Sequence, residues 1–303
     1  MRTAFLGTSD FAATVLRRLA ESPHRPLLVV TPPDRPKGRG RRTAPPPAAT
    51  AARDLGIDLL QAGNVNEEPA FERIRATRPE ALAVCAFGQL IRGPLLSEWP
   101  MLNVHPSLLP RWRGAAPIER AIAAGDARTG VCVMKVTEGL DAGPVALCEE
   151  VEIGPEEDFE TLSGRLAALG GELLVRSLDL LAESRLEFTE QAEEDVTYAE
   201  KIGADERRLD PAGSAADLAR IVRALTPHIG AYLETNGGER LGVRRARAVD
   251  VEVDMKEGEM RAEWGALLLG CGQDALRLEV VQPPGGKPMT ADAYLRGHPL
   301  PKP

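Results

Sequence analysis

The sequence predicts an α/β protein in which a parallel-rich sheet is followed by a smaller, antiparallel β domain. Through residues 1–181, apolar segments of strand length alternate with amphipathic segments of helical length, a pattern typical of parallel strands wrapped by helices. After residue 213, one short helical segment leads into strand-like segments punctuated by glycines. A chain of 303 residues is long enough for two domains. We expect these domains at 1–190 and 209–303, joined by a linker at 191–208.

The first strand is expected at residues 2–6, where it enters a tight turn. Ser9 or Asp10 would then cap a helix that ends near Glu21. The apolar residues of this segment recur at helical spacing on one face, namely Phe11, Val15, Leu16 and Leu19. Further buried strands are expected at 27–31, 54–60, 81–86 and 101–104, with a helix at 67–76.

Two more strands are expected at 131–136 and 145–153, followed by a long helix over 159–181. Residues 184–210 are polar and charged, which is typical of an interdomain connection. A short helix from Ser214 precedes the C-terminal strands. These strands predict an antiparallel β domain that could close into a barrel.

The composition is that of an ordinary globular protein, with 43% hydrophobic and 27% charged residues. No segment approaches the ~20 apolar residues that a membrane span needs, so we expect a cytoplasmic protein. The net charge of −8 argues against a general nucleic-acid binder. The four cysteines are isolated, without ligand spacing for zinc, and we expect small buried hydrophobic residues and no disulfide framework.

The strongest chemical pattern combines an amide, an imidazole and a carboxylate. Asn103 and His105 lie two residues apart, so on a strand they project from the same face. They would stand at the carboxyl end of a parallel strand, where open α/β sheets bind ligands. Asp141 lies between Gly139 and Gly143 in a turn. The Asn amide could donate to an oxyanion, and Asp141 could orient the imidazole, although plain turns use the same residue types.

These residues belong to longer strings that resemble the folate-dependent formyltransferases. The matching residues are 103–110, followed by Arg113-Gly114, and the turn at 139–143. The resemblance implies that Asn103, His105 and Asp141 are catalytic and that the formyl donor is 10-formyltetrahydrofolate, with no metal. It also implies that the residues holding the folate are Ser107, Leu108, Leu109 and Pro110, together with Phe87 and Gly88 in the pterin pocket. A Tyr is more usual at Phe87.

A run of positive charge interrupts the first half of the chain. Its five basic residues, with no acid among them, are Arg35, Lys37, Arg39, Arg41 and Arg42. Because like charges repel, we expect a loop that is mobile until a polyanion neutralises it. For most charge runs, a solvated surface loop is the simpler alternative.

Three segments resemble the family members that formylate methionyl-tRNA. They are 5–12, in which Ser9 replaces the usual Pro, 33–42 and 197–201. The resemblance assigns the basic loop to the acceptor end of initiator methionyl-tRNA, and we expect Arg39 to matter most. It also implies an OB-like C-terminal barrel. Candidates for tRNA contact there are Arg240, Arg244, Arg245 and Arg247, although a simple packing module remains the alternative.

Other functions fit the sequence less well. A nicotinamide dehydrogenase would need a G-x-G-x-x-G turn, whereas residues 7–12 contain only one glycine. A non-catalytic RNA-binding module would leave Asn103, His105 and Asp141 without a purpose. Glycinamide-ribonucleotide transferases are shorter, while sugar-nucleotide formyltransferases and formyl-folate hydrolases should lack the basic loop. We therefore expect a monomeric enzyme that produces N-formylmethionyl-tRNA for translation initiation.

Overall fold

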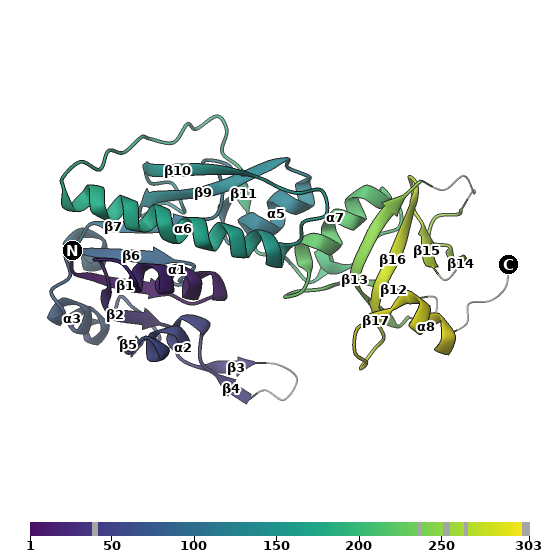
Figure 1. The fold of residues 1–303 in the computed structure, drawn as a ribbon, viewed down its shortest axis with the longest axis horizontal. Coiled ribbons are helices and arrows are strands. Elements are labelled where there is room, and N and C mark those ends of the chain that lie inside the picture. Colours follow the sequence, from purple (N-terminus) through teal and green to yellow (C-terminus); the bar gives the residue numbers. More distant parts are fainter. Residues whose placement is uncertain (38–41, 236–237, 251–254, 264–265, 299–303) are drawn as a thin grey trace. The chain divides into compact units, whose positions relative to one another are not determined.

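The computed structural model describes residues 1–37, 42–235, 238–250, 255–263 and 266–298 (Figure 1). The chain forms two compact units. Unit 1 consists of Met1–Gly114, Arg128–Glu152 and Ser163–Tyr198, and unit 2 of Ala115–Ala127, Ile153–Leu162 and Ala199–Pro303. Each unit therefore combines stretches that are separated in the sequence.

A seven-stranded sheet is the centre of unit 1, with the strand order β10-β9-β7-β6-β1-β2-β5. Its strands are β1 (Thr3–Gly7), β2 (Pro26–Thr31), β5 (Asp58–Gln61), β6 (Ala81–Cys85), β7 (Met101–His105), β9 (Arg128–Lys135) and β10 (Val145–Glu152). The strands from β7 to β5 run parallel, whereas β9 pairs antiparallel with both β7 and β10. The predicted α/β class with a parallel-rich sheet is confirmed.

Helices pack on both faces of this sheet. On one face, Ile74 of α3 (Glu68–Ala76) and Leu95 of α4 (Pro94–Glu98) share a core cluster with Met101 of β7. On the other, Gly170 of α6 (Phe159–Ala182) approaches β7 so closely that an added Cβ would lie 2.7 Å from Val104 Cγ1. Figure 1 shows α6 running beside α1 (Asp10–Ala20). Because strand residues alternate, Asn103 and His105 face away from α6.

The first helix begins as the sequence predicts. Ser9 Oγ accepts a hydrogen bond from Ala12 N–H, which caps α1, and the helix ends at its C-cap Glu21. The prediction of a strand from residue 54 was wrong at its start, because α2 (Pro47–Asp54) occupies the preceding residues. Pro47 suits the first helical turn, and Gly56 follows the helix with φ +64°. Unit 1 also contains the short strand β8 (Arg113–Gly114) and the start of β11 (Tyr198–Ala199).

Unit 2 is built around antiparallel strands in the order β12-β13-β16-β15-β14, with β17 paired to β16. Its strands are β12 (Ala231–Glu234), β13 (Arg240–Val249), β14 (Met260–Glu263), β15 (Ala266–Gly270), β16 (Ala275–Gln282) and β17 (Met289–Thr290). Its helices are α5 (Pro117–Ala124), α7 (Ala215–Leu225), α8 (Ala291–Gly297) and a short 3₁₀ turn at Asp205–Arg207. The predicted antiparallel β domain is confirmed, and its closure into an OB-like barrel stays a prediction. Among the described residues, no helix combines the length and apolar character needed to cross a membrane.

The cysteines correct one expectation. Cys132 and Cys148 form a disulfide, because the register of β9 and β10 places them directly opposite each other. Cys148 is exposed, so it is not the buried hydrophobic residue we expected. Cys85 and Cys271 are buried free thiols. Burial raises the pKa of Cys85, and it raises the pKa of Cys271 to about 11, so neither is a thiolate at neutral pH.

The expected basic loop is not a loop throughout, because a short strand forms at each of its ends. Arg35–Lys37 forms β3 and Arg42–Ala44 forms β4, and the two strands pair antiparallel. The pairing joins Arg35 to Ala44 and Lys37 to Arg42 through the backbone. A hairpin of this kind needs only local contacts, so backbone hydrogen bonds offset part of the charge repulsion. Residues 38–41, with Arg39 and Arg41, lie outside the described residues.

We expect thiol labelling to distinguish these cysteines. In the native protein without reductant, alkylating reagents should modify neither Cys85 nor Cys271, because both are buried and protonated. In denaturant without reductant, mass spectrometry should find these two modified and a Cys132–Cys148 cross-linked peptide. Alkylation of all four cysteines under those conditions would contradict the observed disulfide.

Candidate active site

Strand β7 brings Asn103 and His105 to the carboxyl end of the parallel sheet. Asn103 pairs with Val84 of β6, and His105 lies opposite Cys132 of β9. Pro106 follows directly and ends the strand. The His105 residue is only 4% exposed, whereas Asn103 is half-buried. The strand thus holds an amide and an imidazole on one face, as their spacing predicts.

Asp141 lies in the turn between β9 and β10. Its φ of +46° is in the left-handed region, which an Asp tolerates better than most residues. Gly143 ends the turn against β9, where an added Cβ would lie 1.9 Å from the Lys135 carbonyl oxygen. Only glycine allows this close approach of the two backbones. Because Gly143 has no side chain, the turn that carries Asp141 can lie directly against β9.

The three predicted catalytic residues lie together. Asn103 Nδ2 is 3.5 Å from Asp141 Oδ1, and His105 Nδ1 is 3.6 Å from Asp141 Oδ2. The Gly114 backbone N–H donates a hydrogen bond of 2.9 Å to the same Oδ2 atom. The Asp141 side chain is only 17% exposed. An amide donor, an imidazole and a largely buried carboxylate thus converge from β7 and the β9–β10 turn.

The second ring nitrogen of His105 also faces an oxygen. His105 Nε2 is 2.9 Å from the backbone oxygen of Trp112, and Trp112 N–H donates to Thr197 Oγ1 at 2.8 Å. A carbonyl oxygen only accepts, so Nε2 carries a proton in this arrangement. With the Asp141 carboxylate on the other side, both N–H groups of an imidazolium would face acceptors. The site therefore suits a positively charged His105.

The predicted folate residues lie in two segments at this edge of the sheet. Ser107 is fully buried, and its hydroxyl donates to the Arg111 carbonyl at 2.7 Å, which closes the loop after β7. Leu108 packs on β9, since an added Cβ at Gly130 would lie 2.5 Å from Leu108 Cδ2. Leu109 and Pro110 are half-buried and joined by a cis peptide bond.

The other predicted folate residues follow β6. Phe87 is only 3% exposed and belongs to the core cluster that α3 and α4 form with one face of the sheet. Its carbonyl accepts a 2.6 Å hydrogen bond from Thr8 Oγ1. Gly88 has φ +75°, which turns the chain at this point. The Phe87 side chain thus acts in packing, and this segment presents backbone groups at the strand end.

Sequence reasoning missed the contribution of residues 189–197. Gln191 Nε2 donates to the carbonyls of Asp141 and Gly143, at 2.9 and 2.7 Å, and its Oε1 accepts from Arg113 Nε at 2.9 Å. Thr197 lies in a segment that carried the family resemblance, so a signal for it existed. Gln191 lies in a stretch whose polar composition predicts only a linker. Its partners are 78 and about 50 residues away in the chain, beyond any local pattern.

The basic residues predicted to contact tRNA differ in their surroundings: Arg35 on β3 is exposed, whereas the arginines of β13 contact other side chains of the protein. On β13, Arg244 donates to Gln282 Oε1 at 2.6 Å, and Arg245 and Arg247 both pair with Glu279 at 2.8 and 3.2 Å. The Arg240 guanidinium lies 4.6 Å from the centroid of the Tyr232 ring. Intramolecular partners thus satisfy part of the charge on β13.

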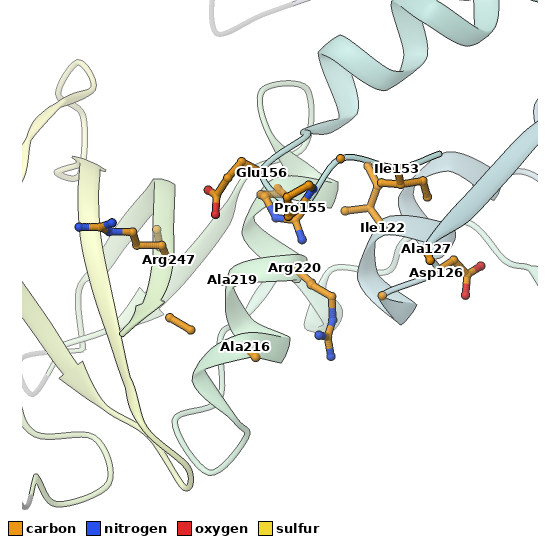
Figure 2. A pocket seen from close by; sticks show the side chains of 15 residues that line it. Ile122, Asp126, Ala127, Ile153, Pro155, Glu156, Ala216, Ala219, Arg220 and Arg247 are labelled. Atoms are coloured by element: carbon orange, nitrogen blue, oxygen red, sulfur yellow. The ribbon is translucent and has the colours of Figure 1, made fainter. Parts of the chain in front are cut away.

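A pocket of about 510 Å³ lies within unit 2. Figure 2 shows α7, with Ala219 and Arg220, between Arg247 on one side and Ile153 on the other. Arg223 also lines it and donates to the Glu157 carbonyl at 2.7 Å. Burial lowers the pKa of Arg223 from its usual value. Of the predicted site residues, the catalytic and folate residues do not line this pocket, whereas Arg247, a candidate for tRNA contact, does. No group of three or more metal-ligating side chains occurs within the described ranges.

Comparisons with known proteins show the family of this chain. Two family models match, formyl transferase over residues 1–178 and formyl transferase, C-terminal domain over 201–299. The methionyl-tRNA formyltransferase of Methylococcus capsulatus is 42% identical over 302 residues, covering 99% of this chain and 98% of the relative. That of Xanthomonas campestris pv. campestris is 43% identical, with 97% of each chain covered.

Solved structures share the fold. The N-formyltransferase from Helicobacter canadensis, in complex with folinic acid and dTDP-3-aminofucose, matches with a TM-score of 0.67 at 11% identity, covering 91% of this chain and 98% of that one. HypX from Aquifex aeolicus, in complex with tetrahydrofolic acid, matches with a TM-score of 0.63 at 17% identity, covering 97% of this chain and 47% of that one. The family models and full-length relatives go further than the fold. This chain belongs to the formyl transferase family, in its methionyl-tRNA formyltransferase branch.

Proposed function

We propose that the protein transfers the formyl group of 10-formyltetrahydrofolate to the free amine of initiator methionyl-tRNA, giving N-formylmethionyl-tRNA. The observation that carries this proposal is the convergence of Asn103, His105 and Asp141 at the end of β7. Full-length relatives named methionyl-tRNA formyltransferase support the choice of acceptor. Among the alternatives, a non-catalytic RNA-binding module would leave this convergence unexplained.

The chemistry is acyl transfer to an amine. The neutral α-amine attacks the formyl carbon, and the carbonyl oxygen becomes an oxyanion in the tetrahedral intermediate. The Asn103 amide donates a hydrogen bond to this oxygen, and the positive charge of protonated His105 stabilises it electrostatically. The Asp141 carboxylate balances the positive charge of the ring from 3.6 Å. The C=O bond then re-forms as the C–N bond to the folate breaks, the proton lost by the attacking amine is taken up by the folate nitrogen, and tetrahydrofolate leaves.

Asn103 is well placed to act as an oxyanion donor. Its contact with Asp141 is 3.5 Å, at the outer limit of a hydrogen bond. The amide N–H groups are therefore only weakly committed and available to a substrate oxygen. Because strand β7 holds the residue rigidly, little reorganisation is needed when charge develops.

The folate donor is assigned to the loop after β7 and the end of β6. Leu108, Leu109 and Pro110 present half-buried apolar groups, and Phe87-Gly88 presents backbone groups that suit a pterin ring with many donors and acceptors. The tetrahydrofolic acid in HypX and the folinic acid in the Helicobacter canadensis enzyme support a folate in a protein of this fold.

The tRNA is assigned first to residues 35–42, which include β3 and the start of β4. In this segment Arg35, Lys37, Arg39, Arg41 and Arg42 supply positive charge against a chain of net charge −8. The division into a catalytic domain at 1–190, a linker at 191–208 and a C-terminal domain at 209–303 that contacts tRNA is part of the proposal. A cytoplasmic, monomeric enzyme remains our prediction.

The acceptor can be tested directly. We expect the purified protein with 10-formyltetrahydrofolate to formylate charged initiator methionyl-tRNA. Uncharged tRNA has no free α-amine and should give no product, and charged elongator tRNA should react more slowly. Mass spectrometry of the released aminoacyl group measures the product. Formylation of an amino sugar nucleotide in place of methionyl-tRNA would contradict the proposal.

The hairpin should govern the salt dependence of tRNA binding. Each phosphate contact contributes ~0.7–0.9 to the slope of log affinity against log salt. The double variant Lys37→Gln/Arg42→Gln should therefore lower the slope by about 1.4–1.8. The matched control is Arg17→Gln/Arg73→Gln, since these exposed arginines already pair with Asp54 and Asp58 at 2.9 and 2.8 Å. Equal slopes for the hairpin variant and the wild type would exclude the hairpin as a phosphate contact.

A further inference from the structure

We infer that Gln191 is a positioning residue for the formyl transfer, because it holds the turn that carries Asp141 in register with the imidazole of His105. The inference rests on the proposed function, since it concerns the geometry of the same site. Gln191 lies outside the matched strings at 103–110 and 139–143. Its side chain nevertheless contacts the Asp141 turn directly.

The carboxamide of Gln191 uses both of its ends. Nε2 donates to the Asp141 carbonyl at 2.9 Å and to the Gly143 carbonyl at 2.7 Å. Oε1 accepts from Arg113 Nε at 2.9 Å. The opposite amide orientation would place Oε1 against two carbonyl oxygens, so the network fixes the assignment. The side chain thus links the Asp141 turn to the Arg113-Gly114 segment.

That link closes a ring of contacts around the catalytic groups. The Gly114 N–H next to Arg113 donates to Asp141 Oδ2 at 2.9 Å. On the opposite side of Arg113, Trp112 accepts from His105 Nε2 through its carbonyl at 2.9 Å. Arg113 therefore lies between the backbone groups that contact Asp141 and His105. Gln191 ties this segment to the Asp141 main chain, so it sets the spacing of both catalytic side chains.

Gln191 can do this because its own segment, the strap at residues 189–197, is anchored at both ends. Thr189 exchanges two backbone hydrogen bonds with Val145 at the start of β10, at 2.8 and 2.9 Å. At the other end, Thr197 accepts from the Trp112 N–H and its carbonyl accepts from the Arg113 N–H. All of these residues belong to unit 1. The strap therefore holds the Gln191 side chain against a fixed frame.

The catalytic contacts are sensitive to small displacements of the turn. Asp141 meets Asn103 and His105 at 3.5 and 3.6 Å, longer than the usual hydrogen-bond distances. These long contacts alone are too weak to hold the carboxylate in place. The Gln191 and Gly114 hydrogen bonds are shorter, so they determine where the carboxylate lies. A shift of about 1 Å in a catalytic group can cost on the order of 100-fold in rate.

Three variants of the full-length protein test this role in the formylation assay. Gln191→Ala removes all three hydrogen bonds, and Gln191→Glu keeps an acceptor for Arg113 but replaces the two donors with oxygen. Exposed Glu193 on the same strap provides the matched control, Glu193→Gln. We expect both Gln191 variants to lower kcat by up to about 100-fold, with small changes in KM for folate and tRNA. The control should keep the wild-type kcat.

A double-mutant cycle separates positioning from general stability. If Gln191 acts through Asp141, adding Gln191→Ala to Asp141→Asn should lower kcat by less than threefold beyond Asp141→Asn alone. A full, multiplicative loss in that background would overturn the inference. So would wild-type kcat in Gln191→Ala and Gln191→Glu, or a loss confined to the melting temperature. A wild-type protein that formylates no methionyl-tRNA would instead refute the proposed function.

Discussion

The organisation of unit 1 depends on one largely buried carboxylate. Asp141 is placed at the end of a parallel sheet, where the Gly114 N–H donates to it at 2.9 Å and the His105 ring faces it at 3.6 Å. A charged group that leaves water needs partners to offset its desolvation. Here those partners come from segments far apart in the chain, so satisfying the carboxylate also assembles the site. The groups that offset the cost of burying the Asp141 carboxylate are therefore the same groups that form the proposed active site.

Close backbone packing makes this placement possible. Gly143 lets the turn approach Lys135, and Gly130 lets Leu108 pack on β9, where side chains would collide. The Cys132–Cys148 disulfide joins the same two strands, and Cys132 lies opposite His105. The β9–β10 hairpin is therefore a rigid support with little freedom to move Asp141. Rigid support of this kind is what electrostatic preorganisation requires.

Local sequence patterns predicted much of the fold and of the candidate site. The features that they missed depend on contacts between residues far apart in the chain. Asn103 and His105 could be placed on one strand face because their spacing matches the strand period, and the cap of the first helix could be narrowed to Ser9 or Asp10. The pairing of Cys132 with Cys148 required the register of two strands, which spacing does not give. The role of Gln191 could not be predicted, because a polar residue within a polar segment does not stand out in the hydrophobic pattern of the sequence. The arms at 35–37 and 42–44 formed strands despite their charge.

We propose that the Asn103 amide, held on β7, stabilises negative charge on the formyl oxygen. The most direct measurement is kcat of Asn103→Ala in the formylation of methionyl-tRNA. Because Asn103 makes only a 3.5 Å contact with Asp141, its removal should leave the fold and the folate KM largely unchanged. We predict a fall in kcat of about 10²–10³-fold, as for other oxyanion donors. A folded variant with near-wild-type kcat would contradict it.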